Sequence, residues 1–194
     1  MRRRTFLQSA VASAAVAALP RRQLFAAVVG ARPQGLSDVD AITGDGKRVT
    51  LTAKMLADLK GQLRGRLLLA GDEGYDSARQ VLNPSFDKRP ALVVQPTGVA
   101  DIRTAVNFAR DNSGLLLAVK CGGHSASGQS TCDRGMMIDL SLFRDVRVDP
   151  VARRAWVTGG SLLGQVDHEA MAHGLVTPLG TVSHTGVGGL VTGG

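Results

Sequence analysis

Hydrophobic positions between residues 89 and 120 predict a strand, a helix and a second strand. The first strand is an apolar run at 91–94, which ends before Pro96. The apolar positions that follow have the spacing of one buried helix face, made up of Val99, Ile102, Val106 and Ala109. A second apolar run covers 115–120. A strand, a helix of this length and another strand together predict a parallel β–α–β unit.

The residues before this unit give weaker signals. Thr52 is a suitable N-cap for a helix over 53–65. The expected buried face of that helix is Leu56, Leu59 and Leu63. A short helix is expected over 76–82, because Asn83 and Pro84 follow it. Residues 27–49 show no clear periodicity, and we interpret them as a linker without regular structure.

The residues after the unit predict further strands and one more helix. A strand is expected at 136–140, and two strands at 146–149 and 154–158 are expected to form a hairpin. Ser161 is a candidate cap for a helix over 162–173. The last 15 residues contain six glycines, and we interpret them as loops that lie close to a bound molecule. The order predicts an α+β fold, with a small parallel β–α–β unit beside a mixed or antiparallel sheet.

Positive charge is concentrated at the start of the chain. The formal net charge of the 194 residues is +7, and without the five arginines within the first 22 residues it is +2. A nucleic-acid-binding domain carries its basic residues in a stripe on the folded surface. We therefore expect no nucleic-acid partner.

The first 26 residues have the features of an export signal. Arg3-Arg4-Thr5-Phe6-Leu7 resembles the twin-arginine consensus, and an 11-residue stretch of small and apolar residues follows it up to Pro20. That stretch is too short to cross a bilayer. A basic amphipathic or disordered tail is the alternative interpretation. Export by the twin-arginine route would place the protein in the periplasm or outside the cell, with no membrane association beyond export.

A glycine turn directly follows the strand expected at 115–120. It consists of Gly122 and Gly123, followed at once by His124 and Ser125. Glycines at the end of a strand allow backbone amides to approach a phosphate group, and the histidine can act as a nucleophile or ligand. On these residues alone, a tight turn with an exposed histidine is an equal alternative.

The cysteines and histidines do not have the spacing of a metal site. Cys121 and His124 form the only close pair, whereas a structural zinc site needs four ligands in paired spacing. We expect no metal. Cys121 and Cys132 are expected to be free thiols, although an oxidising compartment would allow them to pair.

Three features together resemble a known family. They are the Gly122-Gly123-His124-Ser125 turn, the strand at 136–140 with Asp139, and the glycine-rich run 180–190. This set resembles the FAD-linked oxidases with a PCMH-type FAD-binding domain, the berberine bridge enzyme-like branch of the vanillyl-alcohol oxidase superfamily. The resemblance covers residues 71–194 and is strongest from Arg89 onward.

The resemblance implies FAD as the cofactor, held by a covalent bond from His124 to the 8α-methyl group of the flavin. Some members have a second bond from a cysteine in the later loop, but Val182 stands at that position here. A single histidyl bond is therefore expected. The other cofactor-binding residues that the resemblance implies are Cys121, Gly122, Gly123, Ser125, Gly128, Asp139, Thr181, Val182, Ser183, Gly186, Gly188 and Gly189.

The resemblance also implies a domain plan and a reaction. Residues 1–26 would be the signal, 27–87 a linker and helical lead-in, and 88–194 an incomplete FAD-binding domain of the PCMH type. The expected reaction is hydride transfer to FAD from an alcohol or amine C–H bond of a small-molecule substrate. The catalytic base of related enzymes lies in a later part of the chain, so no catalytic residue is assigned and this fragment alone is expected to be inactive. A non-catalytic, exported flavin-binding module is the competing hypothesis.

Overall fold

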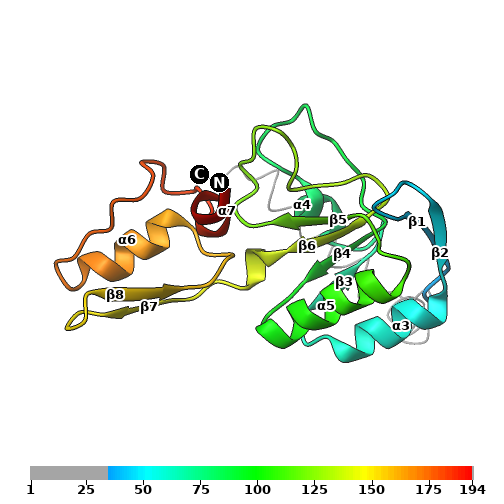
Figure 1. The fold of residues 1–194 in the computed structure, drawn as a ribbon, viewed down its shortest axis with the longest axis horizontal. Coiled ribbons are helices and arrows are strands. Elements are labelled where there is room, and N and C mark those ends of the chain that lie inside the picture. The colour runs from blue at the N-terminus through cyan, green and yellow to red at the C-terminus, as the bar shows by residue number, and fades with distance from the viewer. Residues whose placement is uncertain (1–34, 194) are drawn as a thin grey trace, which may run out of the picture. The chain divides into compact units, whose positions relative to one another are not determined.

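Residues 35–193 are described in a computed structural model, so the expected export signal at 1–26 lies outside the described residues. A four-stranded sheet forms the centre of this part of the chain (Figure 1). In spatial order its strands are β3 (Arg66–Leu68), β4 (Leu92–Gln95), β6 (Met136–Asp139) and β5 (Leu117–Lys120). β4 and β5 both run parallel to β6, and β3 runs antiparallel to β4.

The predicted β–α–β unit is confirmed, with β6 placed between its two strands. The connecting helix α5 (Val99–Asp111) is rotated relative to the expected face: Val99 is 63% exposed and Val106 is 43% exposed. Ala109 is buried as predicted, but its buried neighbours are Asp101 and Ala105. The Asp101 carboxylate accepts hydrogen bonds from the amides of residues 64, 65 and 97, which turns that side of the helix inward.

The region before the central sheet contains more structure than expected. β1 (Val39–Ile42) and β2 (Arg48–Leu51) form an antiparallel hairpin. The expectation of a linker without regular structure is therefore wrong for these residues. Each strand has only four residues, too few for alternation to stand out, yet the hairpin contributes Ala41 and Leu51 to the core.

The two helices expected in this region are present. α3 (Ala53–Gln62) begins at Thr52, whose side chain accepts a hydrogen bond from the Met55 amide. Leu56 and Leu59 of α3 are buried, as predicted. The short helix α4 (Tyr75–Arg79) lies one residue earlier than expected at its start and ends three residues earlier.

The predicted hairpin and helix after the central sheet are also confirmed. A 3-10 turn η1 (Leu140–Leu142) follows β6, and β7 (Val146–Asp149) pairs antiparallel with β8 (Arg154–Val157). α6 (Leu163–Met171) packs on this hairpin and buries Leu163, Val166 and Ala170. Ser161 does not cap α6; its hydroxyl donates to the Asp145 carbonyl instead.

The glycine-rich end is not entirely a loop. A short helix, α7 (Val187–Gly193), closes it and buries Val187 beside α6. The expectation of loops alone is wrong here, because seven residues are enough for a short helix whose glycines leave room for close packing. Among the described residues, no helix is long and apolar enough to cross a membrane.

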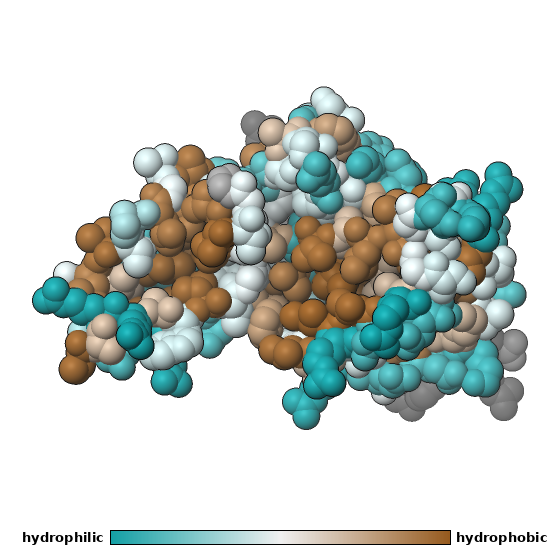
Figure 2. Space-filling model, viewed as in Figure 1, coloured by the Kyte–Doolittle hydropathy of each residue, from teal (hydrophilic) through white to brown (hydrophobic). Residues whose placement is uncertain are grey.

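The outer edge of the central sheet is apolar. β5 is one of the two edge strands, and its residues Leu117 and Val119 are 36% and 47% exposed. Figure 2 shows apolar surface on the same face of the molecule, in the region where Figure 1 draws β5 and β6. Val119 leads directly into the glycine turn and lines the cavity described next.

Candidate functional site

Two glycine-containing segments cross in direct backbone contact, one directly after β5 and one before α7. A Cβ atom on Gly122 would lie 2.4 Å from the amide nitrogen of Gly186. A Cβ atom on Gly186 would lie 2.2 Å from the amide nitrogen of Gly122. Real Cβ atoms do not come this close to backbone atoms, so each side of the crossing requires glycine.

The crossing fixes the position of His124. The backbone amide of Gly186 donates a hydrogen bond to Nδ1 of His124, with a nitrogen–nitrogen distance of 3.3 Å. Gly123, with a φ of 72°, provides the left-handed conformation that turns the chain between β5 and the histidine. The carbonyl of Gly123 accepts from the Leu82 amide at 2.7 Å, which holds the turn from its other side.

A cavity of about 590 Å³ opens beside this turn. Six of the thirteen residues predicted to bind the cofactor line it: Cys121, Gly122, Gly123, His124, Ser125 and Gly189. They come from two segments that are far apart in the sequence, the end of β5 and the start of α7. The structure therefore brings together the two glycine-rich motifs on which the prediction depended.

The turn offers unused hydrogen-bond donors. Among the residues that the structure describes, no group accepts a hydrogen bond from the backbone amides of residues 122–127. The hydroxyls of Ser125 and Ser127 lie 3.1 Å apart in the same stretch. Consecutive free amides and hydroxyls beside a cavity are suited to bind phosphate oxygens.

The other predicted cofactor-binding residues do not line the cavity. Gly128 lies against the ring of Phe86, and Asp139 is buried beneath the turn at the end of β6. Gly186 and Gly188 pack against the turn itself, on Gly122 and on the sulfur of Cys121.

The position at which some relatives have a second flavin bond does not line this cavity. Thr181, Val182 and Ser183 belong to an exposed loop before α7, and the carbonyl of Ser183 accepts a hydrogen bond from the amide of Gly164 in α6. None of the three residues lines the cavity.

The sequence analysis missed several residues that line the cavity. They are Val119, Ala126, Ser127, Gln129, Ser130, Leu190 and Gly193. The run of small and polar residues after His124 is the signal that could have identified residues 126–130 as part of the same loop. Leu190 and Gly193 belong to the glycine-rich end that was expected to lie close to a bound molecule, but neither was assigned to the cofactor.

Both cysteines are free thiols in the structure, as expected. Burial raises the pKa of the Cys121 thiol, and burial raises the pKa of Cys132 to about 11. Cys121 lines the cavity, whereas Cys132 is buried in the loop that leads to β6. Within residues 35–193, no three His, Cys, Asp or Glu side chains come together in a group that could hold a metal ion.

Comparison with protein families identifies this arrangement. A family model described as an FAD-binding domain matches residues 90–194, which is more than half of the chain. The chain belongs to this FAD-binding family. The match covers the β–α–β unit, the glycine turn with His124 and the glycine-rich end, so FAD is confirmed as the cofactor of the family to which these residues belong.

Individual relatives agree with this assignment. The chain is 36% identical over 133 residues to an FAD-linked oxidoreductase of Dictyostelium discoideum, which covers 68% of this chain and 29% of that protein. It is 30% identical over 132 residues to (R)-6-hydroxynicotine oxidase of Paenarthrobacter nicotinovorans, with the same two coverages of 68% and 29%. The chain therefore spans less than a third of the length of these relatives.

A solved structure confirms the fold. The crystal structure of wild-type BBE-like 1 from Physcomitrella patens matches with a TM-score of 0.63 and 27% identity, over 69% of this chain and 29% of that one. The predicted resemblance to the FAD-linked oxidases and the predicted α+β fold of a PCMH-type domain are thus both confirmed.

Proposed function

We propose that this chain is the FAD-holding part of an oxidoreductase and that His124 binds the flavin covalently. One observation carries the proposal: six consecutive backbone amides, which have no acceptor among residues 35–193, lie beside a cavity that His124 also lines. An FAD molecule has both parts that such a site would contact, a pyrophosphate and a flavin ring.

Each part of the turn has a distinct task in this proposal. The amides of residues 122–127 and the hydroxyls of Ser125 and Ser127 bind phosphate oxygens. The two crossing glycines leave the backbone bare, which allows the cofactor to approach closely. The Gly186 amide holds the imidazole ring of His124 in one orientation, so the ring is already in a fixed rotamer when the flavin binds.

When bound, FAD supplies an acceptor for hydride from a C–H bond. We propose a small molecule with an alcohol or amine group as the substrate. Support for an oxidoreductase comes from the names of the relatives, one an FAD-linked oxidoreductase and another an oxidase of 6-hydroxynicotine. The alternative of a non-catalytic flavin-binding module is not favoured, because these relatives are named as enzymes.

Denaturation tests the proposed bond. The chain is produced with an ample supply of FAD and precipitated with acid, and we expect yellow colour in the pellet. Trypsin should then release the peptide from Cys121 to Arg134 with the mass of the flavin added. His124→Ala should lose this mass. His184→Ala is the matched control, because His184 lies in the exposed loop and does not line the cavity.

Three results would contradict the proposal in whole or in part. Flavin that stays with the His124→Ala protein through acid would assign the bond to another residue. Flavin mass on the peptide that contains Val182 would disprove the single histidyl bond. If the wild-type protein binds FAD but releases all of it in acid, FAD remains the proposed cofactor, but the proposed covalent bond is disproved.

We also propose export through the twin-arginine route. The support is the Arg3-Arg4-Thr5-Phe6-Leu7 motif and the apolar stretch that follows it. That route carries folded proteins, so a flavin bound in the cytoplasm would travel with the protein.

A further inference from the structure

Lys120 is a buried lysine directly before the cofactor-binding turn. It is the last residue of β5, and only 7% of its surface is exposed. A lysine is rarely buried unless its charge is compensated. The sequence analysis gave Lys120 no role, and Lys120 does not line the cavity.

The ammonium group of Lys120 binds the end of α4. Nζ donates to the carbonyl of Ala78 and to the carbonyl of Gln80, the latter at 3.3 Å. Both carbonyls lie at the C-terminal end of the short helix, where unpaired carbonyls and the helix dipole favour a cation. Lys120 therefore connects the strand that leads into the turn with the helix that lies behind it.

Asp139 supplies the compensating charge. Its carboxylate lies 3.5 Å from Nζ of Lys120, and the two residues are direct partners in the pairing of β5 with β6. Gln95 and Ser141 donate further hydrogen bonds to this carboxylate. Burial lowers the pKa of Lys120, and the carboxylate of Asp139 counteracts that shift. The pair is therefore a fully buried element directly beneath the turn.

The turn itself rests on the same support. The stem of Lys120 packs under Gly123, since a Cβ atom there would lie 3.3 Å from its Cδ. Leu82, two residues after Gln80, donates its amide to the carbonyl of Gly123 at 2.7 Å. The side chain of Asn83 donates to the carbonyl of Ala126 at 3.2 Å. The segment 78–83 is thus in contact with the turn at three points.

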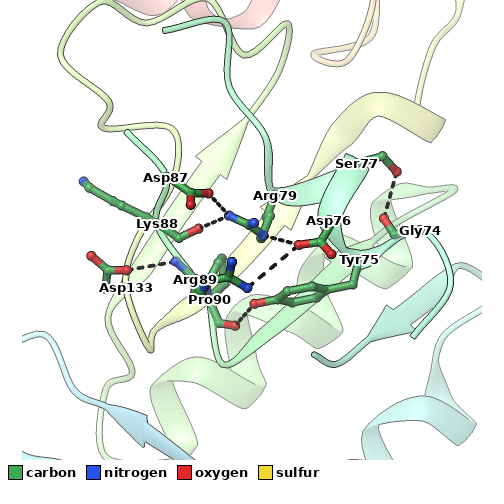
Figure 3. Close-up of polar contacts among 10 residues, drawn as sticks. All are labelled: Gly74, Tyr75, Asp76, Ser77, Arg79, Asp87, Lys88, Arg89, Pro90 and Asp133. Carbon is green, nitrogen blue, oxygen red and sulfur yellow. Dashed lines mark hydrogen bonds and ion pairs between the residues drawn. The ribbon is translucent and has the colours of Figure 1, made fainter. Parts of the chain in front are cut away.

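A second set of contacts keeps this segment in place (Figure 3). The buried guanidinium of Arg79 donates to the carboxylates of Asp76 and Asp87 and to the carbonyl of Lys88. Figure 3 shows these partners gathered around Arg79 from both sides of the loop that follows α4. The segment that supports the turn is consequently held in place by the hydrogen bonds and ion pairs of Arg79.

We propose that Lys120 is a positioning residue: it holds the Gly122–Gly123–His124 turn against residues 78–83 in the shape that receives FAD. This inference rests on the proposed binding of FAD in the cavity beside the turn. Lys120 touches neither the cavity nor the cofactor in this proposal, and it acts through the backbone of the turn.

The test removes both charges of the buried pair. Lys120→Met alone would leave the charge of the buried Asp139 carboxylate uncompensated, which destabilises a protein for reasons unrelated to the turn. The double variant Lys120→Met, Asp139→Asn avoids this, because paired removal of buried charges is tolerated far better. We expect the double variant to keep its melting temperature. Its Kd for FAD, measured by flavin fluorescence with His124→Ala also present so that binding is reversible, should rise by roughly tenfold or more over that of His124→Ala alone. The same background serves the other Kd comparisons.

Two comparisons make the test specific. Lys120→Arg retains a cation at the end of α4 and should restore most of the FAD affinity. Lys88→Met is the matched control, because Lys88 binds the carbonyls of Gly128 and Thr131 at the far end of the same loop. It should change the affinity much less than the double variant does.

Hydrogen exchange gives a readout that needs no cofactor. The Leu82 amide is protected by its bond to Gly123, so its exchange reports whether the turn is docked. In the double variant this amide should exchange faster while core amides such as those of Val94 and Ile138 do not change. Should the double variant unfold, Lys120→Gln with Asp139→Asn replaces it, because glutamine keeps an uncharged donor near the carbonyls of residues 78 and 80. Faster Leu82 exchange and weaker FAD binding in that folded protein support the proposal, and wild-type values of both overturn it.

Several outcomes would overturn the inference. A folded double variant with wild-type FAD affinity and wild-type Leu82 protection would remove any positioning role of Lys120. An equal loss of affinity in Lys88→Met would show that any loosening of the loop has the same effect. Failure of the wild-type chain to bind FAD would instead contradict the proposed function. In that case, Leu82 exchange in the double variant would still show whether Lys120 holds the turn in place.

Discussion

The backbone amide of Gly186 donates to Nδ1 of His124, and the two residues are 62 positions apart in the sequence. This contact joins the two glycine-rich motifs of the chain at the edge of one cavity. The ring of His124 is therefore oriented by a residue of the second motif and not by its own turn alone.

Gly122→Ala should prevent the two segments from crossing. Its Cβ atom would lie 2.4 Å from a backbone nitrogen that cannot turn aside as a side chain can. We expect a loss of stability of about 1–3 kcal/mol, the usual range for overpacking, together with loss of FAD binding. Thermal unfolding and flavin fluorescence measure the two effects.

Gly61→Ala is the matched control for that substitution. Gly61 lies near the end of α3, and no atom lies within 4 Å of the position that its Cβ would take. Alanine favours helix over glycine by up to about 1 kcal/mol, so this variant should be as stable as the wild type or slightly more stable. A Gly122→Ala protein that melts and binds FAD like Gly61→Ala would show that the crossing is not required.

Asp101→Asn should destabilise the chain most at neutral pH. Burial raises the pKa of the Asp101 carboxyl, but hydrogen bonds from Thr97, Arg64 and Gly65 more than offset this and leave the pKa lowered. A lowered folded-state pKa gives stability that is present above the ordinary value of 3.8 and is lost as the pH falls through the folded value. We expect a cost of about 1–3 kcal/mol at pH 7, and this difference from the wild type should shrink below pH 4 (roughly).

Asp111→Asn provides the comparison. Asp111 is the last residue of the same helix, and among residues 35–193 its one ion pair is with the exposed side chain of Arg110. The change in unfolding free energy should stay within about 0.5 kcal/mol. Denaturant unfolding curves at several pH values in the acid range measure both variants. An equal loss of stability in Asp101→Asn and Asp111→Asn would contradict the stabilising role of Asp101.

The two thiols should differ in their reaction with an alkylating reagent. Cys132 is buried with a pKa of about 11, so that at pH 8 roughly one molecule in a thousand carries the reactive thiolate. Cys121 lines the cavity and should react first, and FAD should slow its reaction. Mass spectrometry of digested samples over time follows both sites. Equal rates for the two cysteines in the folded chain would contradict this placement of Cys121.

Export should depend on the arginine pair. Replacing both Arg3 and Arg4 by lysine should stop a fused reporter from reaching the periplasm, because the twin-arginine route reads that pair. Replacing Arg21 and Arg22 in the same way keeps the charge and leaves the motif intact, and should have little effect. An unchanged periplasmic yield from the Arg3 and Arg4 variant would reject the proposed signal.

Much of the central fold could be predicted because its signals are local. The apolar runs that become β4 and β5 are continuous, and the turn at Gly122 and Gly123 follows the second run directly. The buried face of α5 could not be predicted from spacing. It depends on Asp101, a charged residue that the pattern would place outside. The nearby amide of residue 97 and the distant amides of residues 64 and 65 hold it inside.

The candidate site was predicted in part for a related reason. His124 and its neighbours are adjacent in the sequence, so their place at the cavity could be expected. Asp139 was placed at the cofactor on the basis of the family resemblance, but it lies beneath the turn as the partner of Lys120. Strand pairing decides which side chain faces a ligand and which one supports the backbone. The hydropathy pattern along the sequence does not contain this information.

The Lys120 contact and the glycine crossing also bear on the order of folding events. Asn83 reaches Ala126 across 43 positions, and Gly186 reaches His124 across 62. Contacts between residues so far apart form slowly, because a long loop must close before they can. Local helices and hairpins such as α3 and β7–β8 can therefore form while the turn is still open. Capture of FAD would then be one of the last steps, and the colour of the bound flavin would report when a newly made chain has finished folding.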